Sequence, residues 1–102
     1  QRRGDTLTGV GAYAHYRWWS NPRHLELDEG PFRLIVPLAP GQWSNVSGTF
    51  GNAGAAAITG FRRALADVSE VGMTFGGGCF FGHGVNVSGG TARFVCTSYI
   101  VR

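Results

Sequence analysis

With 102 residues the chain is long enough for one domain with a modest core, and no apolar run approaches the roughly 18 residues that a membrane-spanning helix needs. Glycine contributes 17 residues and aromatic residues 13%, while charged residues make up only 15%, which is too apolar for a disordered segment and typical of a turn-rich β-protein. The basic residues are all arginines and are scattered along the chain, so the net charge of +3 does not predict a nucleic-acid partner.

Residues 1–8 (QRRGDTLT) are polar and predict a flexible lead-in. They contain the triplet Arg3-Gly4-Asp5, a motif of integrin ligands, but three residues recur by chance and nothing in the sequence indicates a presented loop. Residues 9–19 then alternate, with Val10, Ala12, Ala14, Tyr16 and Trp18 on one side. A period of two residues predicts a strand with one face on the core.

Two further short strands are expected at residues 23–28 and 32–38, joined by a turn, with Pro37 marking an edge. A strand at 42–48 carries Trp43. Asn45-Val46-Ser47 and Asn86-Val87-Ser88 match the glycosylation pattern, which is short and matches often by chance.

One helix is predicted at residues 55–67, where Ile58, Phe61, Leu65 and Val68 recur at helical spacing. Gly60 weakens this helix by about 1 kcal/mol relative to alanine. The remaining residues, 71–102, predict a closing hairpin with a long last strand at 91–101.

The two cysteines, Cys79 and Cys96, lie in the strands of this hairpin. We expect a disulfide between them, and therefore an oxidising compartment outside the cytosol. The alternative is two buried free cysteines that act as small hydrophobic residues. In total the pattern predicts an all-β fold, a single antiparallel β-sandwich (a jelly roll) over residues 9–102 with one short helix.

Three stretches carry a family resemblance: PFRLIVPLAPGQWSNVSG (31–48), FRRALADVSEVGMTFGGG (61–78) and TARFVCTSYIV (91–101). They resemble the C-terminal portion of galactose-binding-like jelly-roll domains, of the laminin-B type and of secreted bacterial carbohydrate-binding modules. The resemblance implies a sandwich fold and a glycan ligand. Little sequence precedes Gly9 to supply the first strands of such a domain, so a sandwich completed by a partner chain stays open.

A candidate ligand-binding surface lies on the first predicted strand. Aromatic rings and nearby hydrogen-bonding groups complement the C–H faces and hydroxyls of sugars. The alternative is that Trp18 and Tyr16 belong to the core and Trp19 caps it. The proposed binding residues are Tyr13, His15, Arg17, Trp18 and Trp19.

A second candidate surface is the glycine-rich loop with Phe80, Phe81 and His83, which we expect at an interface with another chain, local packing being the alternative. No helix follows this loop, so it does not predict a phosphate site. Glu26, Asp28 and Glu29 could hold a structural calcium ion, although carboxylates in a turn are usually solvated. A zinc site at His15 and His24 would need strands that bring them together, so no metal site is predicted.

No nucleophile or metal-protease motif is present, so we expect no enzyme and no cofactor. The leading hypothesis is a secreted, extracellular, non-enzymatic binding module whose partner is a polysaccharide or glycan. The alternative is a structural subunit of an extracellular filament or surface assembly, in which identical subunits self-assemble by strand addition.

Overall fold

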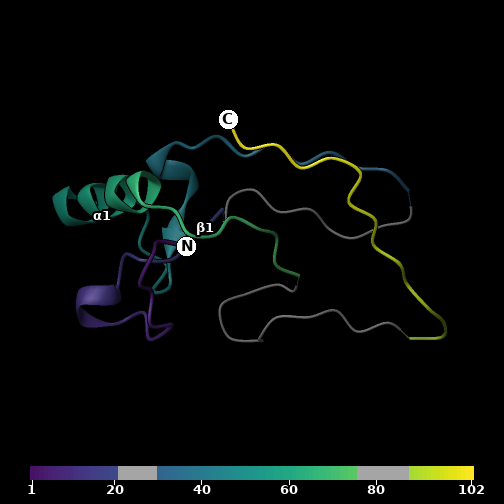
Figure 1. Cartoon of the computed structure of the whole chain (residues 1–102), viewed down its shortest axis with the longest axis horizontal. Coiled ribbons are helices and arrows are strands. Elements are labelled where there is room, and N and C mark those ends of the chain that lie inside the picture. Colours follow the sequence, from purple (N-terminus) through teal and green to yellow (C-terminus); the bar gives the residue numbers. More distant parts are fainter. Residues whose placement is uncertain (21–29, 76–87) are drawn as a thin grey trace. The chain divides into compact units, whose positions relative to one another are not determined.

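The computed structural model describes residues 1–20, 30–75 and 88–102. The chain forms two compact units, residues 1–72 and residues 73–102, which are described separately. Within the described residues the regular elements all belong to the first unit (Figure 1). They are a 3-10 turn Gly11–Tyr13, strand β1 Trp18–Trp19, a second 3-10 turn Pro40–Gln42, strand β2 Ser44–Asn45 and helix α1 Ala55–Ala66.

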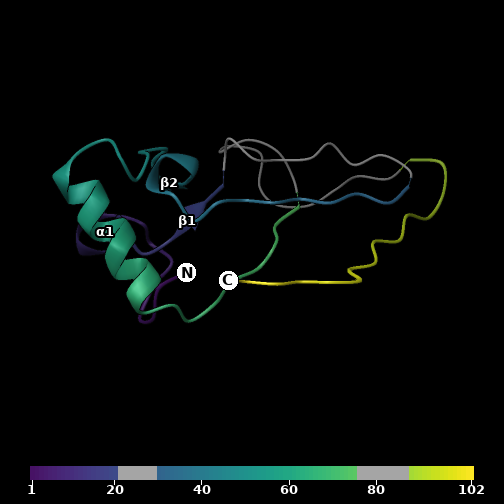
Figure 2. The ribbon, with the colours of Figure 1, turned by 90° about the horizontal axis from the view of Figure 1, so that it is seen from above.

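The sheet consists of β1 and β2, two antiparallel strands of two residues each. Trp18 lies opposite Asn45, and Trp19 lies opposite Ser44. Figure 2 shows the two strands side by side with α1 next to them. The predicted β-sandwich or jelly roll is therefore wrong: the described residues form one small open sheet and one helix.

The prediction of a long strand at residues 9–19 is wrong, because most of this alternating segment does not have extended backbone. Gly9 and Gly11 have φ of 66° and 58°, and residues 11–13 form a 3-10 turn, so only the last two residues of the predicted strand are extended and paired. Residues 32–38 and 91–101, the other described stretches predicted as strands from their alternation, also form no strand in the structure. A strand needs a neighbouring strand to accept and donate its backbone hydrogen bonds. An alternating sequence pattern does not by itself provide that neighbour.

Helix α1, by contrast, confirms the prediction for residues 55–67 to within one residue. Its buried residues are Ala57, Phe61 and Ala64, which lie three and four positions apart on one face. Leu65, which was assigned to the buried face, is 40% exposed, so the buried stripe is rotated from the predicted one.

The core is small and centres on Phe61, which is 2% exposed. The Trp18 ring meets it edge-on with centroids 5.2 Å apart, and the indole Nε1 donates to the carbonyl of His15 at 2.9 Å. This contact joins β1 to α1. Because a buried aromatic side chain contributes several kcal/mol in a core, Phe61 and Trp18 are the main apolar anchor of the unit.

The loop after β2 is organised by the side chain of Asn45, which is 4% exposed. Its Oδ1 accepts the backbone N–H groups of Ser47 at 3.0 Å and Thr49 at 2.9 Å. Gly48, with φ of 77°, completes the turn. Asn45 is therefore committed to the fold, and a glycan on its amide nitrogen is incompatible with this conformation; Asn86 lies outside the described residues.

The N-terminal residues are tied to the end of α1. Arg2 forms an antiparallel bridge with Val68, and the N–H of Arg3 donates to the carbonyl of Asp67 at 2.9 Å. The N–H of Arg2 donates to the carbonyl of Tyr16 at 2.8 Å. The first residues thus lie between the turn at 11–16 and the C-terminal end of the helix.

In the second unit the described residues include an edge-on contact of Phe75 with Phe94, with ring centroids 4.8 Å apart. Cys96 is exposed, and its Sγ lies 3.6 Å from the carbonyl oxygen of Ser98. Among the described parts of the chain, no helix has the length and apolar character needed to traverse a bilayer.

Candidate ligand-binding cleft

A surface cleft of about 410 Å³ lies between the N-terminal segment and one face of α1. This volume is within the range of small-molecule sites, roughly 300–1,000 Å³. The N-terminal segment supplies Arg2, Ala12, His15 and Tyr16, and the helix supplies Ala55, Ala56, Thr59, Gly60 and Arg63. Among the described residues, no aspartate or glutamate lines the cleft.

His15 reaches the helix because Gly60 has no side chain. A Cβ atom on Gly60 would lie 2.6 Å from Cγ of His15 and even closer to its Cβ. On its other side the imidazole stacks on the Trp18 ring, with ring centroids 5.6 Å apart and an interplanar angle of 14°. The ring is therefore held between α1 and the main aromatic of the core.

The protonation pattern of His15 follows from Asn45. Because Oδ1 of Asn45 accepts two backbone N–H groups, its Nδ2 is the donor to His15 Nδ1, at 3.1 Å. A neutral imidazole that accepts at Nδ1 carries its proton on Nε2. Nε2 is then a hydrogen-bond donor, and no partner for it is found in the described part of the chain.

The opposite wall is built from Arg2 and Tyr16. The guanidinium of Arg2 lies over the Tyr16 ring, 4.6 Å from its centroid, a cation–π arrangement. Nε of Arg2 is buried, and the nearest acceptor is Oδ2 of Asp67 at 3.5 Å, longer than a normal hydrogen bond. Asp67 also pairs with Nε of Arg3 at 3.3 Å, so one carboxylate serves two arginines.

Arg63 and Thr59 lie one helical turn apart on α1, and both are exposed in the cleft wall. Neither side chain has a hydrogen-bond or ion-pair partner within residues 1–20, 30–75 and 88–102. Arg63 also lies in the last turn of the helix, where a positive charge is favoured by the helix dipole.

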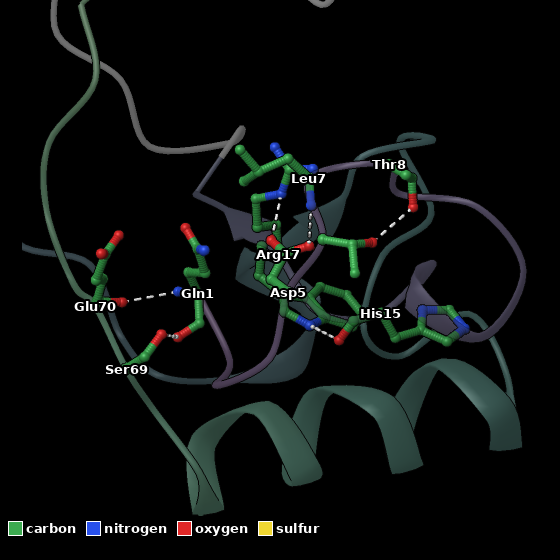
Figure 3. A network of polar contacts seen from close by, with 10 residues as sticks. Gln1, Asp5, Leu7, Thr8, His15, Arg17, Ser69 and Glu70 are labelled. Carbon is green, nitrogen blue, oxygen red and sulfur yellow. Dashed lines mark hydrogen bonds and ion pairs between the residues drawn. The ribbon is translucent and has the colours of Figure 1, made fainter.

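The N-terminal segment also contains an ion pair between Asp5 and Arg17, drawn in Figure 3. Oδ2 of Asp5 lies 2.6 Å from Nε of Arg17, and the Asp5 side chain is 0% exposed. Oδ1 of Asp5 accepts the N–H of Leu7 at 2.9 Å, which holds Leu7 at φ 64°. The carboxylate of the Arg3-Gly4-Asp5 triplet is therefore buried and is not presented on a loop.

The amino group of Gln1 donates to the carbonyl of Glu70 at 2.8 Å, also visible in Figure 3. Burial lowers the pKa of this amino group below its ordinary value of 8.0. The carbonyl of Gln1 accepts from the N–H of Ser69 at 3.0 Å, so the contact is made by backbone groups on both sides.

The five residues proposed from the sequence as a binding surface are half-buried neighbours, but they do not form one flat aromatic face. Of these five, His15 lines the cleft. Trp18 packs in the core, and Arg17 is paired with Asp5, with its guanidinium 5.8 Å from the Trp19 ring centroid. Tyr13 contacts Tyr16, with ring centroids 5.0 Å apart.

The remaining predicted site residues, apart from Cys96, lie outside the described residues. Phe80, Phe81, His83 and Cys79 lie outside the described residues, as do His24 and the carboxylates Glu26, Asp28 and Glu29. Cys96 is a free, exposed thiol in the structure, so its disulfide with Cys79 stays a prediction that a thiol count on the denatured chain tests. The described residues contain no group of three or more histidine, cysteine, aspartate or glutamate side chains placed to hold a metal.

Sequence reasoning missed Arg2, Tyr16, Thr59 and Arg63 as cleft residues. Thr59 and Arg63 are four residues apart on a predicted helix, and this spacing is sufficient to predict that they lie on the same face. Nothing in the sequence connects either of them to Arg2 or Tyr16, because that contact depends on how the N-terminal segment packs on α1.

Comparison of the chain with models of known protein families, with characterised proteins and with solved structures finds no match. The resemblance to galactose-binding-like domains is therefore neither supported nor opposed by any relative.

Proposed function

We propose that this chain is a secreted, non-enzymatic binding module that takes a carbohydrate in the cleft between the N-terminal segment and α1. The observation that carries the proposal is a cleft of ligand size whose polar groups are donors: the guanidiniums of Arg2 and Arg63, the Thr59 hydroxyl and His15. Saccharides present many hydroxyl acceptors on a compact ring, and such a ligand matches a donor-rich lining.

The aromatic rings of the cleft act as walls in this proposal and not as stacking platforms. One face of His15 is covered by Trp18, and a face of Tyr16 is covered by Arg2. Recognition would therefore depend on hydrogen bonds more than on ring stacking. This differs from a surface of exposed tryptophans, in which Trp18 or Trp19 would contact the sugar directly.

We expect the substitution Ala56→Phe to abolish polysaccharide binding, because a large side chain at this exposed cleft position occupies the ligand's volume. Retention of the full chain on cellulose, xylan, polygalacturonate and its methyl ester would be measured by pull-down. Retention on whichever polymer the wild type binds should fall roughly tenfold or more, a loss of about 1.4 kcal/mol or more.

The matched control is Ala66→Phe, which adds the same side chain at an exposed position of α1 outside the cleft. It should bind like the wild type. A wild-type chain retained on none of these polymers, or equal retention of both variants, would contradict the proposal.

A second function, self-assembly by strand addition, is favoured by a separate observation. In residues 30–38 and 88–102, where the structure forms no strand, large apolar side chains are exposed, including Ile35 at 65% and Ile100 at 66%. Alternating apolar segments with exposed side chains are templates for pairing with another strand edge, and a second copy of this chain offers a matching one.

Sedimentation velocity over a concentration series tests this second function. We expect growth of the particle with concentration, and a shift towards monomer for Ile35→Lys or Ile100→Lys, because a charge on a paired strand face is costly. A monomer at every concentration would exclude it.

A further inference from the structure

We infer that the ligand of the cleft carries a carboxylate: it is an acidic saccharide, whose negative charge is held by Arg63. The inference rests on the proposed function and narrows it, because a carbohydrate site need not select for charge. Three features of the cleft lead to it: its charge balance, the lack of a partner for Arg63 among the described residues, and the arrangement of the neighbouring donors.

The charge balance is positive on both sides of the cleft. Arg2 lines one side and Arg63 the other, and no acidic residue among those described lines it. The nearest carboxylate to Arg2, Asp67, is already shared by Arg2 and Arg3. A neutral ligand would leave this excess charge uncompensated, whereas an anionic ligand compensates it.

Arg63 is the group available to make the contact. Arg2 is stacked on Tyr16 and paired with Asp67, so its position is fixed. The guanidinium of Arg63 is exposed at the cleft. Among the described residues it has neither an aromatic ring stacked on it nor a carboxylate paired with it. A guanidinium presents two parallel N–H donors that match a carboxylate in bidentate geometry.

The donors beside Arg63 suit the rest of such a sugar. The Thr59 hydroxyl lies one turn earlier on the same helix face, and His15 offers Nε2–H because Asn45 occupies Nδ1. A ring that places its carboxylate at Arg63 would have hydroxyl acceptors within the range of these two groups.

The test compares polymers that carry carboxylates with related polymers that do not. Binding of the full chain to polygalacturonate and to its fully methyl-esterified form would be measured by affinity electrophoresis, with glucuronoxylan and unsubstituted xylan as a second pair. We expect the acidic member of at least one pair to bind roughly tenfold to a hundredfold more tightly, as for charged hydrogen bonds. The preference should weaken as salt is raised.

Arg63→Gln should remove that preference and leave binding at the level of the neutral polymer. The matched control is Arg62→Gln, which removes an exposed arginine from the adjacent position outside the cleft and should keep the preference. Thermal unfolding of both variants separates a loss of binding from a loss of the helix-dipole contact of Arg63.

The outcomes separate the two claims. Equal binding of acidic and neutral members, with Ala56→Phe still inactive, would overturn the charge inference and leave the carbohydrate function standing. An identical preference in Arg63→Gln and Arg62→Gln would overturn the role of Arg63. No binding to any of these four polymers would overturn the inference, and no binding to cellulose either would overturn the proposed function as well.

Discussion

Replacing Asp5 with alanine should lower the free energy of unfolding by about 3 kcal/mol, because it leaves the charge of Arg17 unpaired in a largely buried site. Asp5 is 0% exposed and Arg17 is 20% exposed, so water can compensate the lost partner only in part. The variant also loses the acceptor for the N–H of Leu7. Urea unfolding followed by tryptophan fluorescence measures the difference.

Asp67→Ala is the control for Asp5→Ala. Asp67 pairs with Arg2 and Arg3, but its side chain is 41% exposed, and exposed ion pairs contribute about 0–1 kcal/mol each. The double variant Asp5→Ala with Arg17→Met should recover part of the loss, because no charge is then left unpaired. Equal losses for Asp5→Ala and Asp67→Ala would show that the Asp5–Arg17 pair is not buried in solution.

Gly60→Ala should destabilise the protein by about 2 kcal/mol, although alanine is the better helix former. Helix propensity favours alanine by about 1 kcal/mol. Against this, the added methyl group overlaps His15, which is held on its other side by the Trp18 ring and by Asn45. Overpacking of a fixed neighbour costs about 3 kcal/mol, which outweighs the gain.

The matched control is Gly72→Ala, where an added methyl group meets nothing within 4 Å. It should leave the free energy of unfolding nearly unchanged in the same urea titration. A Gly60→Ala variant more stable than the wild type would mean that His15 is not packed on α1. The cleft would then lack the wall on which the proposed function depends.

The amino-acid sequence by itself determined α1. Its residues recur at helical spacing, and a helix forms its hydrogen bonds within its own segment, so a local pattern is sufficient. The same kind of reasoning misjudged the strands, because the backbone of a strand is satisfied by another segment. Apolar residues do alternate at residues 9–19, but Gly9 and Gly11 have positive φ, so the backbone at these positions turns and does not continue as a strand.

The tertiary structure alone decided the cleft. His15 was named from the sequence for its chemistry, yet its place depends on Gly60 and Asn45, which are distant in the chain. From the sequence, Gly60 predicts only a lower stability of the helix, and its close approach to His15 is seen in the structure alone. Arg63 became a candidate ligand residue because the N-terminal segment packs opposite it. Contacts of this kind depend on shape and on partners far apart in the chain, and no local pattern of residues encodes them.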